Sequence, residues 1–202
     1  LFIFNTASSA PASFNILTMF LEAKNALVFK KGNETLMIEP WGENSLRVRS
    51  TMEPNFIDRD WALTEKINHG NAKVSVTEQG ASIINGKIEA KVNNNGIITF
   101  YKDGVRILHE YHRSYDPSAT KESCCTKVIN RQWQGIIGGD YKLSVRFESN
   151  DSEKIFGMGQ YQTPYLDMKG CFLELAQRNS QISIPFAVSN LGYGFLWNNP
   201  AV

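Results

Sequence analysis

The residues best suited to chemistry in this sequence include a pair of histidines in the segment LHEYH. His109 and His112 lie three residues apart, with Glu110 next to His109. On a β-strand this spacing places the two imidazoles on opposite faces, where they cannot share a metal ion. On a helix they would share a face, but the β-rich residues before them favour a strand. We interpret both as edge or loop histidines and expect no metal site.

Carboxylates in the last third of the chain are the second group of candidates, because glycosidases use a pair of them. Asp151, Glu153, Asp167 and Glu174 all lie there, but the sequence places no two of them at a working separation. Charged residues that alternate with apolar ones, as in FLELAQ, are typical of the solvated face of a strand. The chain also has no nucleophile elbow, phosphate-binding loop or dinucleotide fingerprint. We therefore expect no self-contained active site and no cofactor.

Composition argues against several classes of partner. The 202 residues carry a net charge of +1, and no basic block could neutralise a row of phosphates, so we expect no nucleic-acid partner. No apolar run approaches the roughly 18 residues needed to cross a bilayer, so we expect no membrane partner. Cys124, Cys125 and Cys171 lack a zinc-binding spacing and are typical of free thiols in a reducing compartment. We therefore expect a cytoplasmic protein.

Alternation of apolar and polar residues is the dominant pattern along the chain. The segments SLRVRS, AKVSVT and KIEAKV each alternate with a period of two, which predicts half-buried strands. Asp103-Gly104 lies between two β-rich runs and predicts a hairpin. Turn residues interrupt the chain about every 8 to 12 residues, as in an antiparallel sandwich. We expect an all-β fold, an antiparallel β-sandwich from Ala26 to Trp197, with Leu1–Thr18 as an unpacked extension.

Several motifs after Glu153 carry a family resemblance. EKIFGMGQYQ contains a glycine-rich strand, and the following segment has a loop with Arg178 and Asn179, a Pro-Phe strand, and the turn GYGFLWNN. Together they resemble the end of the N-terminal domain of glycoside hydrolase family 31, the family of α-glucosidases and α-xylosidases. A weaker likeness upstream, through GKIEAKVNNNGIITFYKDGVRILHE, extends the resemblance to residues 19–202.

The resemblance implies a β-sandwich of the galactose-mutarotase type, followed in the family by a catalytic (β/α)₈ barrel. Such a barrel needs about 250 residues, which this chain does not contain. The family's retaining mechanism uses two aspartates about 5 to 5.5 Å apart, and neither can be assigned here. We therefore expect part of a longer O-glycosyl hydrolase, an α-xylosidase or α-glucosidase that acts on terminal α-linked sugars, with the downstream barrel as this domain's partner.

The loop AQRNSQ supplies the candidate substrate-binding residues. In relatives the corresponding loop helps to close the substrate pocket, so the resemblance implies substrate contacts for Arg178, Asn179 and Ser180. A guanidinium and an amide can bond sugar hydroxyls. Most relatives have aspartate where this chain has Asn179, which keeps the hydrogen-bonding capacity but removes a charge. Alternatively, Arg178 only pairs with a carboxylate across the interface.

A different class of protein would share this architecture. A free-standing carbohydrate-binding or mutarotase-like β-sandwich has the same fold, and fold alone does not decide function. The abrupt ends of the chain, the lack of a plausible mutarotase arrangement of His and Glu, and the turn GYGFLWNN favour the accessory domain. A domain separated from its barrel should expose apolar side chains, and we expect such a patch at Phe195, Trp197 and Pro200.

Overall fold

A computed structural model of the chain describes residues 2–5, 19–56, 71–114 and 127–198. These residues form fifteen β-strands and contain no α-helix. No helix within these ranges could therefore cross a membrane. The strands are β1 Phe2–Asn5, β2 Phe20–Ala23, β3 Ala26–Lys31, β4 Glu34–Pro40, β5 Leu46–Thr51, β6 Lys73–Thr77, β7 Gly80–Asn85, β8 Ile88–Asn93, β9 Ile98–Lys102, β10 Val105–His109, β11 Arg131–Gly135, β12 Tyr141–Val145, β13 Ile155–Gln160, β14 Ile182–Ser189 and β15 Tyr193–Trp197.

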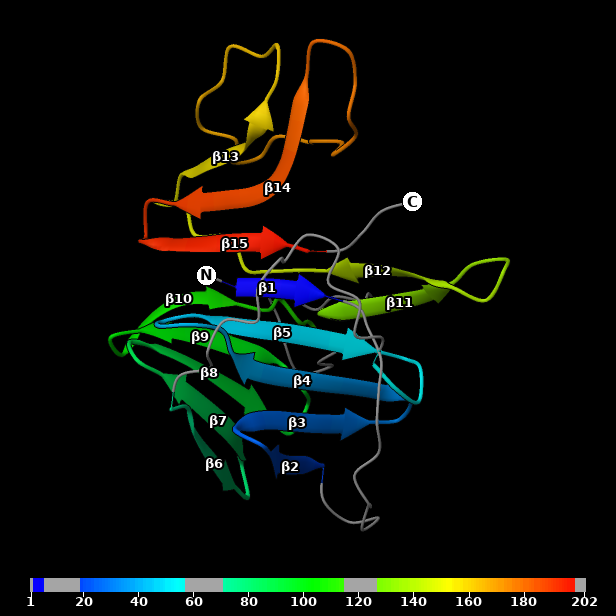
Figure 1. Cartoon of the computed structure of the whole chain (residues 1–202), viewed down its shortest axis with the longest axis vertical. Helices are drawn as coiled ribbons and strands as arrows, with labels where there is room; N and C mark the ends of the chain where they lie inside the picture. The colour runs from blue at the N-terminus through cyan, green and yellow to red at the C-terminus, as the bar shows by residue number, and fades with distance from the viewer. Residues whose placement is uncertain (1, 6–18, 57–70, 115–126, 199–202) are drawn as a thin grey trace, which may run out of the picture.

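The strands assemble into two large sheets and a separate hairpin. The first sheet has the order β13-β14-β15-β1-β5-β4-β3-β2, the second has the order β10-β9-β8-β7-β6, and β11 pairs only with β12. All pairings between these strands are antiparallel apart from those of β1. In Figure 1 strands β2 to β5 lie in front of β6 to β10, and the β11–β12 hairpin extends to one side. The expected all-β sandwich is confirmed.

The Asp-Gly hairpin is also confirmed. Strands β9 and β10 pair antiparallel with Lys102 opposite Val105, so Asp103 and Gly104 form a two-residue turn. Their φ angles are 50° and 79°. Two positive φ angles are what a type I′ turn requires, which explains why Asp followed by Gly occupies this position.

Strand β1 differs from the expectation of an unpacked extension. Phe2–Asn5 pair in parallel with β5 on one side and with β15 on the other. Because β1 fills the gap between two strands that would otherwise be open edges, its backbone groups are bonded on both sides. The expectation for residues 2–5 is therefore wrong. Residues 1 and 6–18 lie outside the described residues, and the domain bounds of 19–202 stay a prediction.

The core lies between the two sheets. Leu27, Leu36, Ile38, Leu46 and Val48 enter it from the first sheet and are fully buried, and the second sheet contributes a matching set, Ile83, Ala90, Val92, Ile98 and Phe100. On β5, β8 and β9 these residues alternate with polar or charged neighbours, which is why a period of two predicted the sandwich.

The expected apolar patch at the C-terminal end is not where the sequence predicted it. Phe195 and Trp197 are partly buried and pack against the core, where Phe195 contacts the ring of Phe147 at 5.6 Å. Pro200 lies outside the described residues. Large exposed apolar side chains lie instead on β14 and in the loop before it, in the turn between β11 and β12, and singly on β6, β7 and β10.

Candidate functional site

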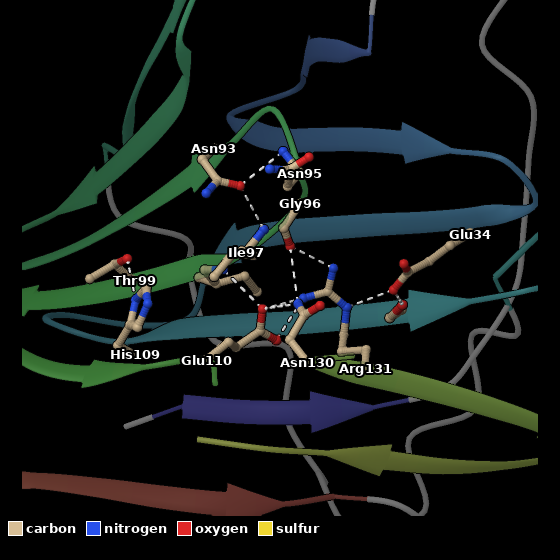
Figure 2. Close-up of polar contacts among 12 residues, drawn as sticks. Glu34, Asn93, Asn95, Gly96, Ile97, Thr99, His109, Glu110, Asn130 and Arg131 are labelled. Atoms are coloured by element: carbon tan, nitrogen blue, oxygen red, sulfur yellow. Dashed lines mark hydrogen bonds and ion pairs between the residues drawn. The ribbon is translucent and has the colours of Figure 1, made fainter. Parts of the chain in front are cut away.

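A cluster of buried charges at the edge of the second sheet is the first arrangement that could do chemistry (Figure 2). Glu110 is fully buried, and its carboxylate accepts bonds from Arg131 Nη1 at 2.6 and 2.5 Å. It also accepts from Asn130 Nδ2 at 2.6 Å and from the backbone N–H of Ile98 at 2.9 Å. Arg131 Nε donates to Glu34 at 2.6 Å.

The charged groups of this cluster already form hydrogen bonds with one another and with neighbouring protein groups. Arg131 Nη2 donates to the carbonyl of Gly96 at 2.7 Å, and Ser50 donates to Glu34 at 2.7 Å. Burial by itself would raise the pKa of Glu34, but attraction to Arg131 and their hydrogen bond lower it overall. The cluster joins β4, β11 and the β8–β9 turn, so we interpret it as a structural tie rather than a catalytic site.

The second arrangement is the β13–β14 hairpin, which rises above the sandwich in Figure 1. Strand β13 contains the sequence Gly157-Met158-Gly159, where the pairing with β14 shifts register and Met158 has a φ of 69°. A Cβ on Gly157 would lie 2.7 Å from the carbonyl oxygen of Phe186, and a Cβ on Gly159 would lie 2.0 Å from that of Ile182. The two glycines are therefore needed for β14 to approach this bulge.

The loop between β13 and β14 is attached to the sandwich at its midpoint. The carboxylate of Asp167 accepts the backbone N–H of Ile155 at 3.0 Å and that of Lys169 at 3.1 Å. Met168 also donates its N–H to the carbonyl of Ile155 at 2.7 Å. These N–H bonds lower the pKa of Asp167, because they favour the charged carboxylate. Asp167 thus divides the loop into two shorter segments.

The second of these segments is held by side chains that bond to backbone. Gln177 donates to the carbonyl of Ser183 at 2.9 Å and accepts its N–H at 3.3 Å, so the amide side chain pairs with β14 as another strand would. Ser183 donates to the carbonyl of Ala176 at 2.9 Å and accepts from Tyr161 at 3.0 Å. These contacts order the chain immediately before and after the candidate residues.

The sequence-predicted residues Arg178, Asn179 and Ser180 lie together on one tight turn. The N–H of Gln181 donates to the carbonyl of Arg178 at 3.1 Å, and Ser180 has a φ of 66°. All three predicted side chains are exposed. Arg178 forms an ion pair with Glu174, four residues earlier in the same loop. The turn therefore presents an amide, a hydroxyl and a partly neutralised guanidinium to the surroundings.

A buried carboxylate fixes the base of the hairpin. Glu153 accepts from Ser189 Oγ at 2.5 Å and from the hydroxyl of Tyr193 at 2.6 Å. Burial raises the pKa of Tyr193, and its bond to Glu153 raises it further. Lys169 Nζ lies 3.9 Å from Glu153, so the loop and strands β14 and β15 meet at one carboxylate. Tyr193 therefore stays a neutral donor at ordinary pH.

Among the described histidines and carboxylates singled out in the sequence, His109, Asp151 and Glu153 line one hollow, but they form no hydrogen bond or ion pair with one another. His109 bonds to Thr99 at 2.7 Å, and burial and nearby lysines lower the pKa of His112. Glu153, Asp167 and Glu174 are each engaged in a different contact. Within residues 2–5, 19–56, 71–114 and 127–198, no three His, Cys, Asp or Glu side chains could hold a metal ion.

The roles of two residues that hold the loop were not predicted. Asp167 and Gln177 form hydrogen bonds with backbone groups that are not adjacent in the sequence. No sequence motif around either residue indicates which backbone group it bonds. Aspartate before a turn is a common backbone acceptor, which gives a weak signal for Asp167. Gln177 gives none, because its role exists only once β14 is in place.

Comparison with known proteins gives consistent results. The family model described as the glycosyl hydrolase 31 N-terminal galactose mutarotase-like domain matches residues 35–202. An uncharacterized family 31 glucosidase of Pseudescherichia vulneris is 42% identical over 195 residues, which span 92% of this chain and 37% of the relative. Alpha-xylosidase A of Aspergillus niger is 29% identical over 201 residues, or 91% of this chain and 26% of the relative.

A solved structure agrees with the sequence relatives. The crystal structure of a GH31 alpha-xylosidase from a soil metagenome, complexed with xylose, is similar with a TM-score of 0.83 and 46% identity. The match covers 91% of this chain and 28% of that one. The chain thus spans about a third or less of the length of the proteins it resembles.

Proposed function

The chain belongs to the glycosyl hydrolase 31 N-terminal galactose mutarotase-like domain family, and from this premise we propose that it is the accessory domain of a retaining α-glycosidase. The longer protein hydrolyses terminal α-linked xylosides or glucosides on a catalytic (β/α)₈ barrel. This domain packs on that barrel, and its Arg178–Ser180 turn forms part of the substrate pocket. The α-xylosidases among the similar proteins support the substrate class.

The observation that carries the proposal is the position of the turn beside an exposed apolar surface on the same hairpin. Ile182, Ile184 and Val188 alternate along β14 and are 53, 50 and 41% exposed. Phe172, in the preceding loop, is 95% exposed. On β14 itself, Ser183 and Ser189 lie next to these aliphatic residues, point to the opposite face of the strand and are buried. A strand with its apolar side chains in water and its serines inside is unfavourable unless another surface covers it.

This arrangement supports the accessory domain over a free-standing sandwich. A free-standing domain would leave the apolar face of β14 in water. It would then lack the free energy of burial, which is about 25 cal/mol for each Å² of apolar surface. A domain that packs on a barrel would bury this face and bring the adjoining Arg178–Ser180 turn to the edge of the contact. The turn would then face whatever ligand lies at that edge.

The chemistry of the turn suits a neutral sugar. The Asn179 amide both donates and accepts, as sugar hydroxyls do. Ser180 adds a hydroxyl, and the Arg178 guanidinium keeps free donors beyond the pair with Glu174. Gln177 and Ser183 hold the backbone on either side, so the turn loses little conformational entropy on binding.

Substitution of Asn179 in the full-length protein tests the proposal. In Asn179→Ala one neutral hydrogen bond is lost, about 1 to 3 kcal/mol, so kcat/KM on an aryl α-xyloside or α-glucoside should fall about tenfold or more. Asn179→Asp should keep substantial activity, because a carboxylate still accepts from a hydroxyl. Asn33→Ala, at an exposed turn far along the chain, is the matched control. Wild-type kinetics in Asn179→Ala would refute the substrate contact.

A further inference from the structure

The outer face of the second sheet carries a row of polar side chains that crosses four strands. Ser75 lies opposite Ser82, Ser82 lies opposite Lys91, and Lys91 lies opposite Thr99. The residues on either side of Lys91, Ala90 and Val92, are buried in the core. Because side chains alternate along a strand, Lys91 and its row point away from the core.

This row forms the floor of a hollow of about 390 Å³. The side chain of Lys91 does not fill the space above the floor, because it extends toward Glu89 and Tyr101, a neighbouring pair on the same face of the sheet. Its Nζ lies 4.8 Å from the centroid of the Tyr101 ring and 3.5 Å from Glu89. Gln79, from the turn between β6 and β7, and Asn93, the last residue of β8, line the hollow as well.

Most of the residues that line the hollow are polar and together carry no net charge, although apolar groups also contribute to its surface. Ser75, Ser82 and the side-chain amide of Gln79 make no side-chain hydrogen bond to any described residue. The one cation and the one carboxylate, Lys91 and Glu89, neutralise each other. A net anionic or cationic ligand would therefore find no uncompensated charge here, and an apolar ligand would leave the hydroxyls unpaired.

We propose that this hollow binds a neutral, linear oligosaccharide. Its volume lies within the range of about 300 to 1,000 Å³ of small-ligand sites. A row across four strands is about 14 Å long, enough for more than one sugar ring to lie across the strands. Hydroxyl and amide groups on the floor match the donors and acceptors of a polyol. The site lies on the opposite sheet from the β13–β14 hairpin, so the inference does not depend on the proposed role of the Arg178–Ser180 turn.

Affinity electrophoresis of the full-length protein tests the site. Native gels would contain xyloglucan, soluble starch or, as a charged comparison, polygalacturonate. We expect at least one neutral glycan to retard the wild-type protein, and the first two gels separate β-linked from α-linked backbones. Ser82→Tyr, which fills the floor, should raise the dissociation constant at least about tenfold. Ser75→Tyr on the exposed edge strand β6 should do the same with less risk to folding.

Two controls separate this site from the rest of the molecule. Ser149→Tyr places the same ring on an exposed loop outside the hollow and should be retarded like the wild type. Hydrolysis of a small aryl glycoside should be unchanged in all three variants, whereas the Asn179→Ala test depends on that rate. Unchanged retardation of Ser75→Tyr and Ser82→Tyr would overturn the inference. Absence of retardation by the neutral glycans, or retardation only by polygalacturonate, would overturn it as well.

Discussion

At the scale of single residues, the ion pair between Glu110 and Arg131 is the most deeply buried one among the described residues, with side chains only 0 and 2% exposed. The Glu110 carboxylate is fully buried and receives four hydrogen bonds, two of them from Arg131. Taking two charges out of water is unfavourable, and it is tolerated only when each bond is made. Removal of one partner should therefore be far worse than removal of an exposed charge.

Glu110→Gln tests this difference. The amide has the same shape but leaves the Arg131 guanidinium without its full counter-charge, so the free energy of unfolding should fall by about 3 to 5 kcal/mol. The control is Glu148→Gln, whose carboxylate lies at the surface 3.2 Å from Arg106 and should change stability by less than about 1 kcal/mol. Urea unfolding of both variants gives the two values. Equal values would mean that the buried pair has no special role.

Asp167 makes a second prediction at this scale, one that depends on pH. Its lowered pKa means that the attachment to Ile155 is present above the ordinary aspartate pKa of about 3.9 and is lost as pH falls through the lowered value. NMR titration of the Ile155 and Lys169 amide protons should show a midpoint below that value. Asp167→Asn should abolish the step. A midpoint at or above 3.9, or the same step in Asp167→Asn, would contradict the attachment.

At the scale of elements, the glycines of β13 decide whether the projecting hairpin can form. Gly159→Ala would place a Cβ 2.0 Å from the carbonyl oxygen of Ile182, so the strands must separate just beside the Arg178–Ser180 turn. We expect a loss of about 1 to 3 kcal/mol in stability and a lower kcat/KM in the full-length protein.

Gly170→Ala is the matched control for this substitution. Gly170 also has a positive φ, of 78°, but no atom lies within 4 Å of its added Cβ. Only the backbone conformation is then unfavourable, by about 1 to 2 kcal/mol. Thermal unfolding and kinetics of the two variants separate the effect of the unfavourable backbone conformation from the effect of the steric clash with β14. If both lose stability equally and both stay active, close approach of β14 is unimportant.

Local patterns predicted the strands in which apolar and polar residues alternate, because the two faces of such a strand differ in polarity. The alternation in KIEAKV became β8, and Asp103-Gly104 became the turn between β9 and β10. Strand β5 departs from the prediction of a half-buried strand. Arg47 and Arg49, expected to be solvated, lie over the rings of Trp41 and Phe56 and are mostly buried. Cation–π contacts with distant rings are not visible in a local pattern.

Other features depend on partners far along the chain, so local patterns could not reveal them. Strand β1 pairs with β5 and with β15, which are far from each other in the sequence. The place of Arg178, Asn179 and Ser180 in a loop followed from family resemblance. The Arg178–Glu174 pair and the roles of Asp167 and Gln177 depend on how that loop folds against β13 and β14. Strand β14 begins with the alternating sequence Ile-Ser-Ile, but there the serine is buried and the two isoleucines are exposed.

At the scale of the whole molecule, the outward face of β14 connects the fold with the proposed function. The sandwich core is complete without Ile182, Ile184 and Val188, which do not belong to it. These side chains therefore contribute little to the stability of the domain itself. Their contribution should appear only when a second domain covers them.

This reasoning predicts opposite effects of one double substitution in two contexts. In the isolated chain, Ile182→Thr with Ile184→Thr should reduce self-association, because the exposed apolar face becomes more polar while the core stays intact. In the full-length protein the same change should lower stability by about 1 to 2 kcal/mol for each isoleucine, because the proposed packing on a second domain would bury this face. Sedimentation velocity measures the first effect and thermal unfolding measures the second.

Val76→Thr, at a residue 48% exposed on strand β6 of the other sheet, is the control and should change neither self-association nor stability. If the double variant and Val76→Thr show the same self-association and the same stability in both proteins, β14 does not pack against a second domain. The argument that the Arg178–Ser180 turn lies beside a substrate would then fail.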